Sequence, residues 1–295
     1  FCAPNLGIGG YIGSAYAPVF VGAADNHPAM DNFKPPEIYD PVDSNRLGKR
    51  RGLLSDIESQ VMAKDAKGTD WNQLREKGYD ALTRKEGREA FELNREPAKV
   101  RDRYGRHPLG QNLLLARRMV EAGVRFVTVN GWAGQAPHDT AGPPSSSWDM
   151  HGGNMGMGNA FGNGSYGMGF CLPRLDQALA ALISDLKDRG MLKNTLLVVT
   201  GEFGRTPNVL TQTPPGRQHW PSSFSSIMAG CGIGGGRVFG KTDKNGAYVT
   251  NNPIRPEEFA ATIYHALDIP LNEPQNNNGV SRPLTTGRPV LELFG

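Results

Sequence analysis

Cysteine is scarce in this chain of 295 residues, which contains only Cys2, Cys171 and Cys231. The three are far apart and odd in number, and no CxxC or zinc-knuckle spacing occurs. The sequence therefore gives no sign of a disulfide framework. A single bridge in an oxidising compartment stays open as an alternative.

The chain also lacks a long apolar run and a strong excess of charge. No segment approaches the roughly 20 apolar residues that a membrane-spanning helix needs. Charged residues make up 21% of the chain and the net charge is +3, which is too small a bias to indicate nucleic acid or an acidic membrane surface as a partner. The arginine clusters at 49–51 and 101–106 are expected to be solvated helix ends and loops. We expect no nucleic-acid partner and no transmembrane segment.

Several motifs of common enzyme classes are missing from the sequence. GxSxG and HExxH do not occur. Residues 230–235, GCGIGG, satisfy GxGxxG, but a dinucleotide site also needs a helix directly after the glycines. Residues 237–240 indicate a strand there, so a glycine turn is favoured over a nucleotide site.

Two units of helix, glycine and strand predict the fold class. A helix at 109–122 is followed by a strand at 125–129, and a helix at 174–189 is followed by an apolar strand at 195–200. Repetition of this unit is typical of an α/β fold, with a mostly parallel central sheet flanked by helices.

The remaining pattern sets the expected domain limits. We expect an irregular, loop-rich segment at 1–47, an α/β domain at 48–270 with a helical excursion at 52–105, and a C-terminal tail at 271–295, in which residues 272–279 are polar and mobile. Further elements are expected as helices at 53–66, 70–93 and 256–267, a strand at 225–229, and a hairpin of 237–239 with 247–249 around the Asn-Gly turn signal at 245–246.

Polar side chains follow both predicted strands. Asp149 and His151 lie in the glycine-rich loop after the first strand, and Glu202, Arg205 and His219 follow the second. Ligands of open α/β sheets collect at the carboxyl ends of strands, and carboxylates and imidazoles are ligands of zinc, manganese or calcium. We expect a divalent metal site formed by Asp149, His151, Glu202 and His219, with Glu202 and Arg205 as catalytic residues.

Each of these residues also has a simpler interpretation. Asp149 and His151 are two positions apart, so both project to one side of an extended segment, but a loop pair that only contacts solvent is as probable. His138 and Asp139 in the same loop are a rival pair. Glu202 is open to three roles: metal ligand, general base, or partner of Arg205, whose planar fork suits phosphate, sulfate or carboxylate.

The segments VRDRYGRHPLGQNLLLARRMVEAGVRFVTVN, WDMHGG, LDQALAALISDLKDRGMLKNTLLVVTGEFGRTP and GRQHWP resemble the domain-of-unknown-function 1501 family, over roughly residues 40–270. That family is grouped with the alkaline phosphatase/sulfatase-like superfamily and is abundant in planctomycete-type bacteria. The resemblance implies an alkaline-phosphatase-like fold with one or two divalent metals. Asp149 and His151 match the superfamily's Asp…His ligands, His219 its late histidine, and Glu202 its second acidic motif. Phe203 stands where the superfamily often has a histidine or asparagine, which puts the second metal in doubt.

The resemblance also implies features that lie outside this chain. The superfamily's first strand, with its Asp ligand and nearby nucleophile, would fall upstream of Phe1, and Thr206 is only a weak candidate nucleophile. We therefore expect that an upstream part of the same protein, or a partner chain, completes the fold. Family members often carry a twin-arginine type signal, which implies a periplasmic or otherwise exported location.

Two functions are compatible with these residues. The first is a metal-dependent hydrolase of phosphate or sulfate esters with an anionic ester as substrate, which the set of acids and histidines favours. The second is a non-catalytic structural or assembly protein that retains the alkaline-phosphatase-like fold. Phe203 and the absence of a clear nucleophile favour the second, and the enzyme stands slightly ahead.

Overall fold

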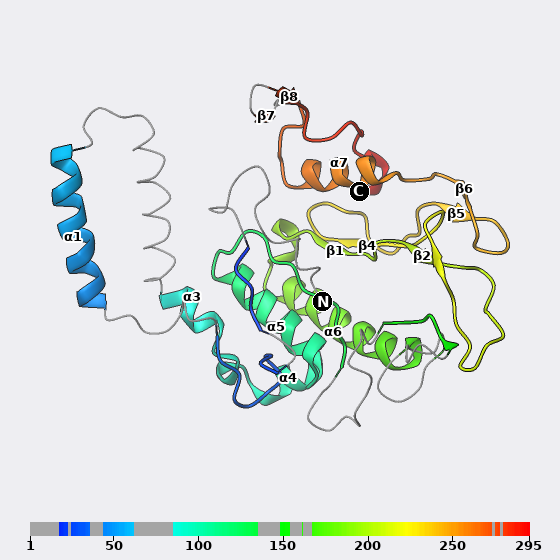
Figure 1. Cartoon of the computed structure of the whole chain (residues 1–295), viewed down its shortest axis with the longest axis horizontal. Helices are drawn as coiled ribbons and strands as arrows, with labels where there is room; N and C mark the ends of the chain where they lie inside the picture. Colours follow the sequence, from blue (N-terminus) through cyan, green and yellow to red (C-terminus); the bar gives the residue numbers. More distant parts are fainter. Residues whose placement is uncertain are drawn as a thin grey trace. The chain divides into compact units, whose positions relative to one another are not determined.

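The structure of this protein is a computed structural model, and the chain divides into two compact units, Phe1–Gly131 and Trp132–Gly295. It describes residues 18–22, 25–35, 44–61, 85–134, 148–153, 161, 167–272, 275–277 and 280–295. Figure 1 traces the order of the elements along the chain by colour. Among the helices in these residues, none has the length and apolar character to cross a membrane.

The described part of the first unit is helical. Its elements are α1 (Ser44–Val61), α3 (Lys85–Ala90), the 3₁₀ turn η4 (Leu93–Arg95), α4 (Ala98–Tyr104) and α5 (Pro108–Glu121). His107 caps α5, because its Nδ1 accepts a hydrogen bond of 3.2 Å from the backbone N–H of Gly110, and Pro108 occupies the first turn. The helix predicted at 109–122 is confirmed.

The other helices of the first unit agree with the prediction only in part. The helix expected at 53–66 begins earlier, at Ser44, and the structure describes it to Val61. Of the helix expected at 70–93, residues up to 84 lie outside the described residues, and α3 is the part that is seen. Of the irregular segment expected at 1–47, residues 44–47 are helical.

The core of the first unit surrounds α5. Leu109 and Leu114 of that helix, Tyr104 of α4 and Phe91 of the turn after α3 are all buried, and α3 and α4 both contact α5. The buried leucines of this helix lie toward its beginning, from Leu109 to Leu115.

A buried ion cluster lies beside this core. Arg117 Nη2 lies 2.8 Å from Glu96 Oε1, with side chains 1% and 6% exposed, and Arg118 contacts the same carboxylate. Arg118 also donates to the carbonyls of Glu89 and Ala90, at 2.5 and 2.8 Å. Burial alone works to raise the pKa of Glu96, but the hydrogen bonds and charges of the two arginines outweigh it and hold that pKa below its ordinary value.

The second unit combines helices with short antiparallel strand pairs. The helical elements are α6 (Met168–Asp188), η6 (Leu192–Asn194), α7 (Pro256–Ala266) and η7 (Leu291–Leu293). The strands are β1 (Leu197–Val199), β2 (Gly204–Arg205), β3 (His219–Trp220), β4 (Ile227–Ala229), β5 (Lys241–Thr242), β6 (Val249–Asn251), β7 (Gln275–Asn277) and β8 (Val280–Arg282). In β1–β4, Leu197 is opposite Ala229 and Val199 is opposite Ile227.

Most local predictions for the second unit are confirmed. The structure has the helices expected near 174–189 and 256–267 and the strands near 195–200 and 225–229. The predicted Asn-Gly turn closes a hairpin, but its strands are 241–242 and 249–251, and residues 237–239 form no strand. The glycine segment at 230–235 forms a turn in which Gly230 has a φ of 85°, and no helix begins after it. This agrees with the glycine turn that was favoured over a nucleotide site.

One further local prediction is wrong. Residues 125–129 are described and form no strand, and Phe126 is 76% exposed. A strand requires a ladder partner, and within the residues that the structure describes no other segment pairs with this one. In the C-terminal tail β7 and β8 pair, with Gln275 opposite Arg282, and the mobility expected there stays a prediction.

The strand pairs bear on the expected fold class. In the described parts of the chain the sheets are β1–β4, β2–β3, β5–β6 and β7–β8, and each pair is antiparallel. A mostly parallel central sheet of alkaline-phosphatase type therefore stays a prediction.

Candidate metal centre

A short ladder brings two of the predicted motifs together. After β1 the chain enters β2, reverses direction, and returns as β3, so that Arg205 lies opposite His219. The backbone N–H of Thr206 donates to the carbonyl of Gln218 at 2.9 Å and extends the ladder. The GEFGRTP and GRQHWP segments are therefore the two sides of one β-ribbon.

Asp149 holds the ring of His151 in place. Asp149 Oδ1 accepts from the backbone N–H of His151 at 2.9 Å and lies 2.7 Å from His151 Nδ1. The two side chains are 11% and 22% exposed. Because the carboxylate accepts at Nδ1, the proton of the neutral imidazole is on Nδ1, and Nε2 presents a lone pair. A carboxylate behind a histidine in this way is the usual outer support of a metal ligand.

His219 meets His151 at that lone pair. The two Nε2 atoms are 2.9 Å apart, and the ring centroids are 4.8 Å apart with the planes at 61°. On the other side of His219, the Phe203 ring packs with a centroid distance of 4.3 Å. Phe203 cannot bind a metal, as the sequence indicated, but it fixes the position of the His219 ring.

Arg205 supplies positive charge at the same point. Its Nη1 lies 3.2 Å from His151 Nε2. Burial lowers the pKa of the Arg205 guanidinium, and the carboxylates of Asp149 and Glu202 act in the opposite direction. The guanidinium stays charged at neutral pH, because the ordinary pKa of an arginine lies far above neutrality.

Glu202 is the outlying member of the predicted set. It is exposed, and it acts on Arg205 through its charge. Within the described part of the chain, it makes no hydrogen bond to either histidine. Its roles as metal ligand and catalytic residue stay predictions.

The loop that carries His151 is fastened to the segment before β3 through its backbone. Gln212 Nε2 donates to the carbonyl of His151 at 2.6 Å, and the backbone N–H of Arg217 donates to the carbonyl of Met150 at 2.8 Å. The backbone N–H of Gly153 donates to the carbonyl of Pro214 at 2.9 Å. Sequence reasoning missed these residues, because no motif or spacing marks Gln212 as a support of His151.

Gly216 permits the close approach of these two segments, and its replacement by alanine is expected to disturb the site. A Cβ at Gly216 would lie 1.8 Å from the carbonyl oxygen of His151, which is backbone and has little room to move. We expect Gly216→Ala to cost about 1–3 kcal/mol of stability and to separate His151 from His219. Thermal unfolding and the NMR signals of the two imidazoles would measure both effects.

The matched control for this change is Gly235→Ala, because a Cβ there meets no atom within 4 Å in the structure. It is expected to leave the imidazole signals unchanged. If Gly216→Ala and Gly235→Ala gave the same histidine signals, the described fastening of the loop would be wrong.

The donor set fits part of a metal site. Zn–N bonds are about 2.0–2.1 Å, so two imidazoles on one tetrahedral zinc have nitrogens about 3.3 Å apart, close to the 2.9 Å observed. Among the described residues, no group of three or more histidine, cysteine, aspartate or glutamate side chains gathers around one point. An ion held by His151 and His219 would therefore take its remaining ligands from water, from the substrate or from Glu202.

The sequence also indicated a rival metal-binding pair and a weak candidate nucleophile. The rival pair, His138 and Asp139, lies outside the described residues. The Thr206 hydroxyl donates to the carbonyl of Asn208 at 3.0 Å and accepts from the backbone N–H of Gln218 at 3.1 Å. A hydroxyl engaged in both directions supports the turn, which weakens Thr206 further as a nucleophile.

The described residues define a chain of two units whose second unit carries a pair of facing histidines supported by a carboxylate. The sequence profile of the family described as "Protein of unknown function (DUF1501)" matches residues 4–294, and the chain belongs to that family. Neither a curated protein nor a solved structure matches the chain.

Proposed function

We propose that this protein is a metal-dependent hydrolase of phosphate or sulfate esters. The observation that carries the proposal is the 2.9 Å distance between the Nε2 atoms of His151 and His219, which are 68 positions apart in the sequence. Separate segments direct two imidazole nitrogens at one point, and Asp149 supports one of the rings from behind. This arrangement supports the proposal, because histidine metal ligands usually have a carboxylate behind the ring.

The neighbouring charges suit an anionic substrate. A bound zinc, manganese or calcium ion would act as a Lewis acid on the ester group. Arg205 lies beside His151 Nε2, and its planar guanidinium is suited to bind two oxygens of a phosphate or sulfate. The charge of Glu202 is near enough to raise the pKa of Arg205. In the proposed site, Glu202 would bind the metal or orient a nucleophile.

Further parts of the proposal rest on the resemblance to the superfamily. They are an alkaline-phosphatase-like fold with a parallel sheet, completion of that fold by an upstream segment or a partner chain, and a periplasmic or otherwise exported location. The completing segment or partner chain would supply the nucleophile, for which the described residues of this chain offer no strong candidate.

One observation favours a second candidate, a non-catalytic structural or assembly protein. The 2.9 Å between the two Nε2 atoms is also a hydrogen-bond length, and Arg205 Nη1 lies 3.2 Å from the same nitrogen of His151. Donation from His219 and Arg205 would satisfy the His151 lone pair without any ion. In that case the cluster only fastens β3 to the loop at 149–153.

The two candidates differ in metal content and in metal-dependent activity. We expect natively purified protein to hold a near-stoichiometric divalent metal by elemental mass spectrometry. Hydrolysis of p-nitrophenyl phosphate or p-nitrophenyl sulfate should be lost after chelation and restored by zinc, manganese or calcium. Metal-free protein without metal-dependent hydrolysis would contradict the enzyme and support the structural role.

Arg205→Gln tests the anion-binding role separately. Because a hydrogen bond to a charged group is removed, KM for the hydrolysed ester should rise about tenfold while the metal content is unchanged. Lys244→Gln, at an exposed turn of the β5–β6 hairpin, is the control. An unchanged KM in Arg205→Gln would remove this residue from the proposed site.

A further inference from the structure

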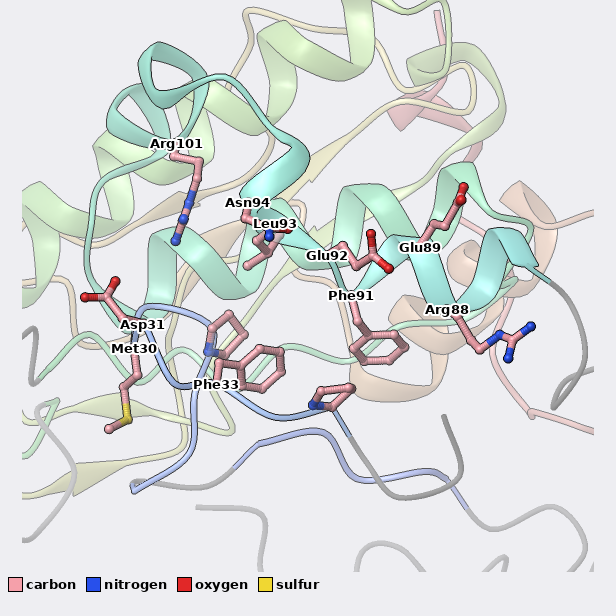
Figure 2. A pocket seen from close by; sticks show the side chains of 12 residues that line it. Met30, Asp31, Phe33, Arg88, Glu89, Phe91, Glu92, Leu93, Asn94 and Arg101 are labelled. Atoms are coloured by element: carbon pink, nitrogen blue, oxygen red, sulfur yellow. The ribbon is translucent and has the colours of Figure 1, made fainter. Parts of the chain in front are cut away.

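The first unit contains a cavity of about 640 Å³, formed by the segment at 28–35 and residues between 88 and 101 (Figure 2). Its volume falls in the range of about 300–1,000 Å³ that is typical of small-molecule sites. The cavity belongs to a different unit from the candidate metal centre. A ligand bound in it would therefore not depend on the proposed hydrolase activity.

One end of the cavity carries Arg101, which the structure holds in a fixed position. Arg101 Nε donates to Gln111 Oε1 at 2.8 Å. Gln111 is fully buried, and its Nε2 donates to the carbonyls of Arg101 and Gly105 at 3.0 and 2.8 Å. Arg101 is half-buried, and burial lowers its pKa, with the charge of Arg106 acting the same way.

Asp31 accompanies Arg101 at this end. Its carboxylate acts electrostatically on the guanidinium, and Figure 2 shows the Arg101 side chain extending toward Asp31. Within the described part of the chain, Asp31 makes no hydrogen bond or ion pair. The end of the cavity therefore presents one cation and one anion that are near each other and not in direct contact.

The cavity lining also contains two glutamates that pair with an arginine and one arginine that points away from the rings. Glu89 Oε1 lies 2.9 Å from Arg95 Nη1, and Glu92 contacts the same arginine. Arg88 also lines the cavity, but in Figure 2 its guanidinium points away from the aromatic rings. The remaining charges of the lining are those of the half-buried Arg101 and the exposed Asp31, at one end of the cavity.

The rest of the lining is apolar and includes two aromatic rings. Phe91 and Leu93 are buried and form part of the wall, and Phe33 and Met30 are half-buried on the opposing segment. Figure 2 shows the Phe33 and Phe91 rings beyond Asp31 along the cavity. An aromatic group placed there would lose its contact with water and gain ring contacts.

We propose that this cavity binds a small zwitterion with an aromatic side chain, of the amino-acid class. The ligand's α-carboxylate meets Arg101, its α-ammonium meets Asp31, and its ring lies against Phe33 and Phe91. A simple anion would be repelled by Asp31 and a simple cation by Arg101. A neutral apolar molecule would give the half-buried guanidinium no polar partner beyond Gln111. A zwitterion satisfies both charges together.

Three related probes test this proposal on the full chain by NMR titration. Phenylalanine carries both charges, N-acetylphenylalanine lacks the ammonium, and phenethylamine lacks the carboxylate. We expect phenylalanine to bind saturably and each of the other two to bind about tenfold more weakly, since each loses one charged contact. Equal affinity for the three probes, or no saturable binding of any, would overturn the proposal.

Substitutions at the charged end give a second test. Asp31→Asn should weaken phenylalanine binding about fivefold, as expected for an exposed charge, and should abolish the preference over N-acetylphenylalanine. Asp25→Asn, an exposed change in the same segment, is the control. An unchanged preference in Asp31→Asn would overturn the assignment of the ammonium site.

Arg101→Gln should weaken phenylalanine binding about tenfold, with Lys99→Gln on the same helix as control and folding verified by circular dichroism. If Arg101→Gln fails to fold, the Asp31→Asn titration still decides the proposal. Undiminished phenylalanine binding in folded Arg101→Gln would overturn the carboxylate site.

Discussion

Replacing His219 by alanine is expected to remove bound divalent metal from this protein. The variant loses one of the two imidazole nitrogens that face each other across 2.9 Å. Loss of an outer partner of a metal ligand already costs about 10–100-fold in affinity, so loss of a ligand should cost more than about 100-fold. Elemental mass spectrometry of natively purified variants, with metal titration of the apo form, would measure the change.

Two further variants identify the cause of that loss. Asp149→Asn keeps both imidazoles but weakens the support at His151 Nδ1, so its metal affinity should fall by the smaller factor of about 10–100. His265→Ala removes a histidine of α7 that packs against Phe294 and should retain the metal. If His219→Ala kept the wild-type metal content, or if His265→Ala lost it equally, the facing histidines would not be the metal centre.

The helices were predictable because their signals are local. In α5, apolar positions repeat at helical spacing, Pro108 is at the first turn, and His107 acts as cap. The α6 and α7 helices follow similar patterns, and the Asn-Gly signal marked the β5–β6 hairpin. The segment at 125–129 has equally strong strand composition, but a strand depends on a partner from elsewhere in the chain. The composition of residues 125–129 does not determine which segment, if any, pairs with them.

The site was predictable to the extent that it follows from residue type. Asp149, His151 and His219 were expected to meet, and in the structure they form one cluster. The contact of Arg205 with His151, and the fastening by Gln212, arise from the chain reversal between β2 and β3. Nothing in the spacing of those residues indicates this reversal. The expected fold class depends on the pairing of strands that are far apart in the sequence. Residue type and local spacing do not determine that pairing.

Glu96→Gln is expected to destabilise the first unit by about 3 kcal/mol at neutral pH, because it leaves the buried guanidinium of Arg117 without its buried counter-charge. Arg117 retains Glu121, but that carboxylate is 43% exposed and cannot replace a buried one. Urea unfolding of the full chain, followed by circular dichroism, would measure the loss. The matched control is Glu92→Gln, which breaks an exposed pair with Arg95 and should cost less than about 1 kcal/mol.

The same pair of proteins should differ in their response to acid. The pKa of Glu96 in the folded chain lies below its ordinary value of 4.5, so the unfolded chain takes up the proton first as the pH falls. The contribution of Glu96 is therefore complete above about pH 4.5 and declines as the pH falls from there through the folded pKa. The stability difference between wild type and Glu96→Gln should be constant from neutral pH down to about pH 5 and should shrink below it. A difference that stayed constant to pH 3, or that grew on acidification, would show that the ionised carboxylate of Glu96 does not stabilise this core.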